Sequence, residues 1–256
     1  MARSALFIIM TLFYPIVVYA AHPLITDDTG TQGKGKFQVE LNGEVTYDKE
    51  TDLAGTTRET GGEVSSIVSY GIIDNIDVVL GIPYQWARVK LDGLTISDED
   101  GVSDVSLEGK WRFYEKGGLS FALKPGITLP TGNEKRGLGS GRMTYGLVFI
   151  TTMEIKPWAF HLNLWYTRNE NKVEERKDIW HGSLASEVEI VKNLKAVGNI
   201  GIERNPDKSF STNPAFILGG LIYSLTDNLD IDLGFKVGIT NPETDYSFLA
   251  GLPLKW

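Results

Sequence analysis

Residues that could support catalysis are few and widely separated in this 256-residue chain. It has three histidines and no cysteine, which excludes a disulfide scaffold and a thiolate nucleophile or metal site. His161 and His181 fall near opposite ends of two successive predicted strands, and His22 precedes the first strand. Ser183 follows His181 on the same strand face, but no Gly-x-Ser-x-Gly or His-Glu-x-x-His motif occurs. We therefore expect no enzyme, no metal and no cofactor.

Charged residues instead recur at alternate positions along polar strand faces. The formal net charge of −8 argues against nucleic acid as a partner, because its phosphates require a basic surface. Inside a closed sheet, such residues would form either a pore lining that favours cations or polar solutes, or ion pairs that fill a small barrel. The candidate lumen-lining residues are Glu40, Glu44, Glu63, Asp77, Glu108, Lys110, Arg112, Lys124, Glu154, Glu187, Glu189, Lys195, Glu203, Asp230, Asp232 and Lys236.

Apolar residues alternate with these polar ones over most of the chain. Phe37, Val39 and Leu41 begin the clearest run, with polar side chains between them. Because successive side chains of a strand point to opposite faces, this period of two indicates strands. The pattern recurs near 76–86, 105–113, 119–129, 143–149, 158–166, 229–239 and 246–256, and more weakly near 63–73, 179–191, 194–204 and 214–225. We predict twelve strands.

Long polar connections alternate with tight turns between these segments. The predicted long loops span 48–62, 91–104, 130–142, 168–178 and 204–213, whereas turns fall near 74–75, 115–118, 156–157, 192–193 and 227–228. This alternation is typical of up-and-down outer-membrane barrels. Three turns end in Asn75, Asn193 and Asn228, and asparagine tolerates the left-handed backbone that closes a three-residue hairpin loop.

Aromatic residues of the apolar face gather near the strand ends. Aliphatic residues dominate between the two groups, which matches a bilayer with its two interfaces. We therefore expect this face to contact outer-membrane lipid and lipopolysaccharide. The outer group is Tyr47, Tyr84, Trp86, Tyr145, Tyr166, Trp180 and Tyr246, and the inner group is Tyr70, Trp111, Phe113, Trp158, Phe160, Tyr223 and Trp256.

A few apolar residues fall on the predicted inner face. Phe216, Leu218 and Ile222 face inward if Leu225 faces lipid. Val148 and Ile150 do likewise in their own segment. Such a strip would suit a hydrophobic permeant. An alternative register would place these side chains outside.

The first 36 residues precede the predicted barrel. Residues 1–20 combine Arg3, an apolar run and a small residue at Ala20, which predicts an export signal cleaved after Ala20. Residues 21–36 are rich in Gly, Thr and Asp and would form either a plug or gate in the lumen or a disordered periplasmic leader. The barrel is assigned to residues 37–256. Its last strand, ending at Trp256, resembles the targeting strand that the barrel-assembly machinery recognises.

Three motifs resemble one bacterial family. They are the stretch His22-Pro-Leu-Ile-Thr-Asp-Asp-Thr-Gly-Thr-Gln-Gly-Lys-Gly-Lys-Phe37, the stretch Leu129-Pro-Thr-Gly132, and the hairpin pattern Tyr-x-Leu-x-Asp-Asn-Leu-Asp from Tyr223. Together they are similar to the outer-membrane transporters of the putative MetA pathway of phenol degradation. The resemblance implies a barrel and the passage of aromatic or other small apolar compounds.

The sequence thus favours an all-β protein, a single antiparallel up-and-down transmembrane β-barrel of about twelve strands. We expect an outer-membrane channel or transporter with a small-molecule permeant. A structural or adhesive barrel without transport is the alternative, and an outer-membrane lipid hydrolase is a weaker one.

Overall fold

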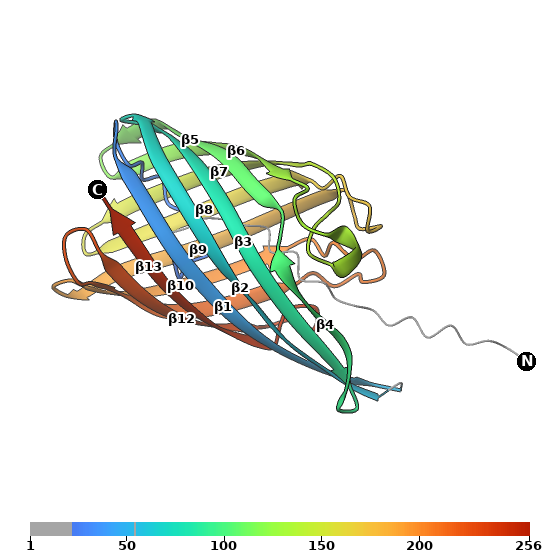
Figure 1. Ribbon diagram of the computed structural model, residues 1–256. Helices are drawn as coiled ribbons and strands as arrows, with labels where there is room; N and C mark the ends of the chain where they lie inside the picture. The colour runs from blue at the N-terminus through green and yellow to red at the C-terminus, as the bar shows by residue number, and fades with distance from the viewer. Residues whose placement is uncertain (1–21, 54) are drawn as a thin grey trace, which may run out of the picture.

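The computed structural model describes residues 22–53 and 55–256 of the chain (Figure 1). Strands dominate these residues, and one short 3-10 helix, η1 (Glu134–Arg136), interrupts them. Among the described residues no helix is long and apolar enough to cross a membrane. The strands are β1 (Phe37–Asp52), β2 (Gly55–Ile73), β3 (Ile76–Leu91), β4 (Leu94–Val102), β5 (Val105–Lys116), β6 (Leu119–Leu129), β7 (Thr144–Ile155), β8 (Trp158–Arg168), β9 (Asp178–Val191), β10 (Leu194–Glu203), β11 (Ala215–Ser224), β12 (Asp230–Gly238) and β13 (Tyr246–Lys255).

Twelve of these strands form a closed antiparallel ring, which confirms the predicted architecture. Each ring strand pairs with its neighbours in sequence, except that β3 pairs with β5 and β4 lies outside the ring on β3. The ring closes between β1 and β13, from Gln38 opposite Lys255 to Tyr47 opposite Tyr246. At this seam the backbone N–H groups of Phe37 and Trp256 each donate to the other residue's carbonyl at 2.9 Å. Closure leaves no unpaired ring edge.

Two of the predicted long loops are wrong, because strands continue through them. β1 and β2 remain paired as far as Asp52 opposite Gly55, so residues 48–62 belong to one long hairpin. Residues 91–104 contain β4, which pairs with β3 up to Leu91 opposite Leu94. Residues 48–62 are polar on both faces because they extend past the apolar band, and in β4 only Leu94, Ile96 and Val102 are large apolar residues. The alternation that marks the rest of the ring is therefore lost or weak in these stretches. Figure 1 shows both hairpins projecting well beyond the barrel wall.

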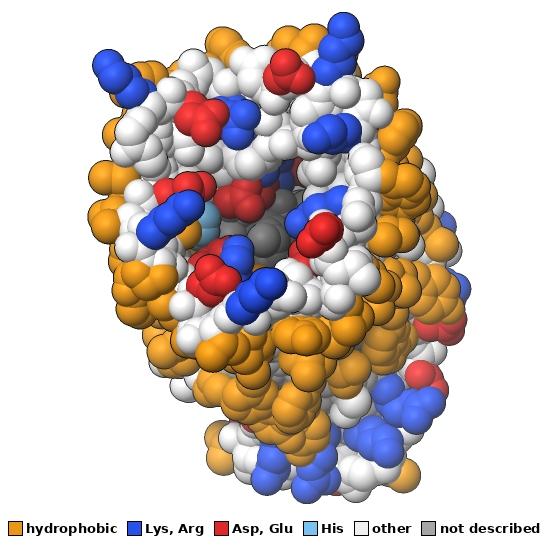
Figure 2. Space-filling model, turned by 90° about the vertical axis from the view of Figure 1, so that its left-hand side faces the viewer, with side chains coloured by type: hydrophobic (Ala, Val, Ile, Leu, Met, Phe, Trp, Pro, Cys, Tyr) orange, Lys and Arg blue, Asp and Glu red, His pale blue; other side chains and the backbone are white. Residues whose placement is uncertain are grey.

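The apolar face of the ring points outward, as predicted. Leu41, Leu164, Leu233 and Phe248 are about half exposed or more, whereas their polar neighbours in sequence are buried inside. Figure 2 shows the outward side chains as a continuous hydrophobic belt around a charged opening. Such a belt is typical of barrels that sit in a bilayer.

The inner face carries three apolar clusters, of which the smallest is Ile67 of β2 with Val79 of β3. The two larger ones lie on other strands. One contains Phe216, Leu218 and Ile222 of β11, and the other contains Val148 and Ile150 of β7 with Ala122 and Trp165. All are at most 8% exposed, whereas Ile217, Leu221 and Tyr223 face outward. The register that places β11 apolar residues inside is therefore correct.

Candidate functional site in the barrel lumen

Residues 22–36 lie against the inner wall of the ring, where two asparagines bind their backbone. On β10, the Asn199 side-chain carbonyl accepts from the N–H groups of Ile25 at 2.7 Å and Thr26 at 3.1 Å. On β8, Asn163 accepts from the Asp27 N–H and donates to the Asp27 carbonyl, both at 2.8 Å. Side chains of the ring thus satisfy backbone groups of the segment that no strand partner pairs.

Asp27 is the centre of a buried charge cluster on this segment. Its carboxylate lies 3.0 Å from the ammonium group of Lys110 on β5 and 2.8 Å from that of Lys124 on β6. Lys124 also lies 3.5 Å from Glu108, and Lys110 lies 3.6 Å from Asp28. Charges removed from water need such close partners. We call Asp27, Lys110, Lys124 and Glu108 the Asp27 cluster.

The rest of the segment follows the inner wall from one side of the seam round to the other. His22 pairs with Asp232 on β12. Farther along, the Gln32 N–H donates to Asp77 on β3 at 2.9 Å, and the Gly35 N–H donates to the Gly71 carbonyl on β2 at 2.8 Å. The segment therefore contacts strands on nearly all sides of the ring before it enters β1.

The predicted lumen residues occupy three kinds of position. Seven are buried at the inner wall: Glu40, Asp77, Lys110, Lys124, Glu187, Asp232 and Lys236. Six are half-buried: Glu44, Glu63, Glu108, Arg112, Glu203 and Asp230. Three are exposed near strand ends: Glu154, Glu189 and Lys195.

Most of these residues are joined in small ion-pair groups rather than in one row. Lys236 lies 3.1 Å from Glu44 and 3.3 Å from Glu243. Glu187 pairs with Lys195 at 2.8 Å and lies 3.6 Å from His161. Farther toward the strand ends, Lys255 pairs with Asp230 and Arg112 with Glu115, both at 3.2 Å. Side chains from the same strand or from nearby strands thus neutralise one another at several levels of the lumen.

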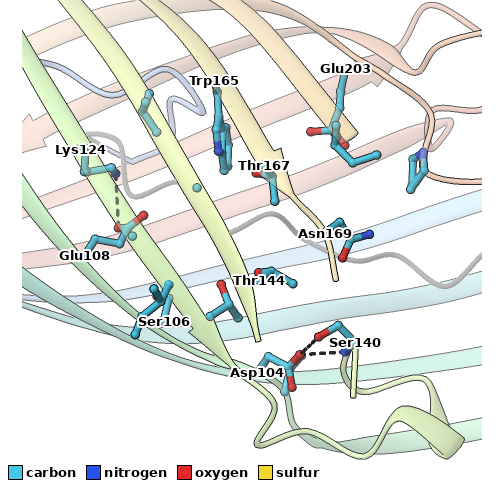
Figure 3. A pocket seen from close by; sticks show the side chains of 18 of the residues that line it. Asp104, Ser106, Glu108, Lys124, Ser140, Thr144, Trp165, Thr167, Asn169 and Glu203 are labelled. Carbon is cyan, nitrogen blue, oxygen red and sulfur yellow. Dashed lines mark hydrogen bonds and ion pairs between the residues drawn. The ribbon is translucent and has the colours of Figure 1, made fainter. Parts of the chain in front are cut away.

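A chamber lies in the lumen on the loop side of the Asp27 cluster (Figure 3). Its empty volume is about 910 Å³, part of it open to solvent. Val148, Trp165 and Ile179 give it an apolar side, and Lys124 and Glu108 mark its inner end. This combination of an apolar wall with a few polar groups is typical of sites for small molecules.

The loop between β6 and β7 folds over this chamber and is fixed by Asp104. The Asp104 carboxylate accepts from the N–H of Gly132 at 2.9 Å and from the N–H and hydroxyl of Ser140, both at 2.8 Å. Thr131 bridges the backbone on either side of Asp104, since its hydroxyl donates to the Ser103 carbonyl and accepts from the Val105 N–H. The Leu129–Gly132 motif is thus the attachment of this loop to the barrel wall.

A second pocket lies beyond that loop. It has about 610 Å³ of empty volume, and Glu59, Glu63 and Trp86 line it from the strands. Leu138, which is only 5% exposed, lines it from the loop. The loop therefore separates two spaces in this half of the lumen.

Sequence reasoning missed Asp27 and Asp104. Asp27 lies in a segment without strand periodicity, and Asp104 lies at the end of the stretch 91–104, which was predicted to be a long polar loop. Asp27 falls within the motif from His22 to Phe37, whereas Asp104 becomes recognisable only when the fold brings it to the motif from Leu129 to Gly132. Trp165 was missed because the other aromatic residues of β8, such as Trp158 and Phe160, have even numbers and face outward. Trp165 has an odd number, and its side chain therefore points inward.

The histidines do not form a catalytic arrangement. His161 contacts Thr152 at 2.9 Å, and His181 lies 3.4 Å from Glu203. Ser183 makes no hydrogen bond to His181, and the described part of the chain holds no group of three or more His, Asp or Glu placed to bind a metal. Each histidine instead lies beside an inward-facing carboxylate, His161 beside Glu187 and His181 beside Glu203.

A family model described as "Putative MetA-pathway of phenol degradation" matches residues 26–256. The chain belongs to this family. This agrees with the resemblance seen in its three motifs. They form the lumen segment, the attachment of the β6–β7 loop and the hairpin between β11 and β12. No curated protein matches the sequence.

Solved structures share this family member's fold. An outer membrane channel from Pseudomonas putida F1 superposes with a TM-score of 0.71 at 12% identity, covering 90% of this chain and 98% of that one. The NanC porin gives 0.56 at 10% identity over 85% and 100% of the two chains. The KdgM porin gives 0.55 at 7% identity over 86% and 99%. At these identities the likeness extends to the barrel alone.

Proposed function

We propose that this chain is a bacterial outer-membrane channel for small solutes. The observation that carries the proposal is a closed ring with an apolar exterior around a chamber that opens to solvent. An apolar belt between aromatic girdles is stable in a bilayer, where it contacts lipid and, in the outer leaflet, lipopolysaccharide. The family and the channels and porins that share the fold support the same function.

The permeants are small and include apolar and aromatic compounds. A ring of twelve strands is narrower than the 16–18-stranded porins, which have open aqueous channels. The apolar side chains of Val148, Trp165 and Ile179 line the chamber, so an apolar solute would find favourable contacts there. The family description supports this solute class.

Residues 22–36 act as a plug that narrows the lumen. Their contacts with Asn163, Asn199 and the Asp27 cluster support this role, because these groups hold the segment inside the lumen against its inner wall. Movement of the segment would then control permeation, and buried charge pairs are strong enough to hold it in place.

Export and assembly complete the proposal. Residues 1–20 serve as a cleaved export signal, although residues 1–21 lie outside the described part of the chain. The last strand, which closes the ring next to β1, would be the segment recognised by the barrel-assembly machinery through Trp256. Mass spectrometry of the protein isolated from outer membranes tests cleavage after Ala20.

Reconstitution in planar bilayers tests the channel function. We expect discrete ionic conductance steps and faster entry of small solutes into proteoliposomes than into empty vesicles. A correctly folded barrel that produces neither would contradict the proposal and favour a structural or adhesive barrel. Hydrolysis of phospholipid or ester substrates, abolished in His181→Ala, would favour an enzyme.

A further inference from the structure

Three buried polar side chains in the chamber make no hydrogen bond with any described residue. They are Thr144 of β7 and Trp165 and Thr167 of β8, which are 9%, 8% and 9% exposed. The residues are mostly buried, but their polar atoms are not among the unpartnered side-chain atoms that the protein encloses completely. All three line the chamber, as Figure 3 shows, so their hydroxyl and indole N–H groups are available to a molecule that enters it.

Strand register brings these groups together around a glycine. Gly146 lies opposite Thr167, and Val148 lies opposite Trp165, so all four residues share the inner face of the β7–β8 pair. A Cβ atom on Gly146 would lie 3.4 Å from the indole nitrogen of Trp165 and 3.8 Å from the Thr167 hydroxyl. The missing side chain therefore leaves both polar atoms uncovered toward the chamber.

The surroundings define what could bind there. Val148 and Ile179 flank the polar atoms and offer apolar contact. The charged residues that line the same chamber are the four carboxylates Asp104, Glu108, Glu175 and Glu203 and one lysine, Lys124. The ammonium group of Lys124 already faces Asp27 and Glu108. An anionic solute would therefore meet net repulsion.

We propose that Thr144, Trp165 and Thr167 form a binding site for uncharged solutes that carry a hydroxyl group on a small apolar body. A hydroxyl group both donates and accepts, so it satisfies the indole N–H and a threonine hydroxyl together. An ammonium group only donates and leaves the indole N–H without an acceptor, and a carboxylate is repelled. The inference rests on the proposed channel function, because solutes reach this site only through the lumen.

Binding of three probes with one common ring tests the site. The full-length mature protein in lipid nanodiscs is titrated with 4-fluorobenzyl alcohol, 4-fluorobenzylammonium and 4-fluorobenzoate, and fluorine NMR reports binding. Empty nanodiscs measure partition into lipid. We expect the alcohol to bind most tightly and the benzoate at least tenfold more weakly. Equal binding of benzoate, or tighter binding of the ammonium probe, would overturn the proposal.

Conservative variants locate the binding. Trp165→Phe keeps an aromatic ring, although a smaller one, and removes the N–H. Thr167→Val keeps the shape and removes the hydroxyl. Each should weaken alcohol binding about three- to tenfold, the effect of one neutral hydrogen bond. Gly146→Ala should weaken it by covering both atoms. Trp158→Phe is the control, because Trp158 lies on the same strand as Trp165, β8, but faces lipid. It should leave binding unchanged.

The experiments distinguish a wrong binding site from a wrong channel function. If all variants conduct ions like the wild type and bind the alcohol equally well, the site is wrong and the channel stands. If the wild type conducts no ions and passes no solute, the channel function is wrong. Each variant is checked for folding by its mobility in SDS gels before and after heating. A shift equal to that of the wild type confirms that the variant is folded.

Discussion

The carboxylate of Asp27 lies 2.8 Å from the ammonium group of Lys124, and both side chains are at most 3% exposed. One belongs to the segment before the first strand and the other to the inner wall of β6. This pair joins the proposed plug to the inner wall of the barrel. Removing this ion pair is therefore the most direct test of whether it holds residues 22–36 in the lumen.

Asp27→Asn should loosen the segment and raise ionic conductance. The substitution leaves two buried lysines without their main counter-charge, which weakens the attachment by about 3–5 kcal/mol. Single-channel recording measures the result as a larger or more often open state. Asp28→Asn is the matched control, because Asp28 is more exposed and lies 3.6 Å from Lys110. Equal conductance of wild type and Asp27→Asn would contradict the plug.

Gly71→Ala tests the same segment without changing any charge. A Cβ atom on Gly71 would overlap the carbonyl oxygen of Gly33, which belongs to the segment backbone. Because a backbone atom cannot rotate away, residues 33–35 must shift, and the hydrogen bond from Gly35 N–H to Gly71 is weakened. We expect higher conductance than in the wild type. Gly109→Ala is the control, since its Cβ would meet nothing within 4 Å.

The barrel was predictable because lipid outside and charge inside impose strict alternation on every membrane-facing strand. The same reasoning failed at residues 48–62, where water surrounds both faces and polarity says nothing about pairing. It also failed for segment 22–36, whose Asp27 is recognisable only once β5 and β6 bring Lys110 and Lys124 to one place.

Turn chemistry was predictable only in part. Asn193 adopts the expected left-handed backbone with φ of 69°, but neither Asn75 nor Asn228 has positive φ. Their side-chain amides instead donate to the carbonyls of Arg112 at 3.1 Å and Lys255 at 2.8 Å. These contacts tie each turn to the neighbouring strand. Only the assembled ring shows whether a turn asparagine adopts a left-handed backbone or binds the neighbouring strand through its side chain.

Asp104→Asn should release the loop between β6 and β7. Its carboxylate accepts three hydrogen bonds from Gly132 and Ser140, and an amide retains one acceptor oxygen. Loss of charge-assisted bonds should lower the free energy of opening this loop by about 1–3 kcal/mol. Trypsin cleavage after the exposed Lys135 or Arg136 measures opening, and it should accelerate roughly tenfold or more. Asp98→Asn, which breaks an exposed pair with Arg88, should change nothing.

Glu175 should make the channel sensitive to pH near neutrality. It lies in the loop between β8 and β9 at the chamber mouth, where Asn169 donates to it at 3.0 Å. Burial, together with the nearby charges of Asp207 and Glu203, raises the pKa of Glu175 to about 7, although the hydrogen bond from Asn169 and the charge of Lys208 oppose this rise. The side chain is thus neutral at pH 6 and gains negative charge as pH rises to 8.

Cation selectivity should therefore increase over this pH range, because the added negative charge at the mouth attracts cations and repels anions. Reversal potentials in a salt gradient, recorded from pH 5.5 to 8.5, measure the change. Glu175→Gln removes the titrating group and should abolish the step near pH 7. Glu174→Gln removes a neighbouring exposed charge and should keep it. A step that persists in Glu175→Gln would assign the titration to another group in the lumen.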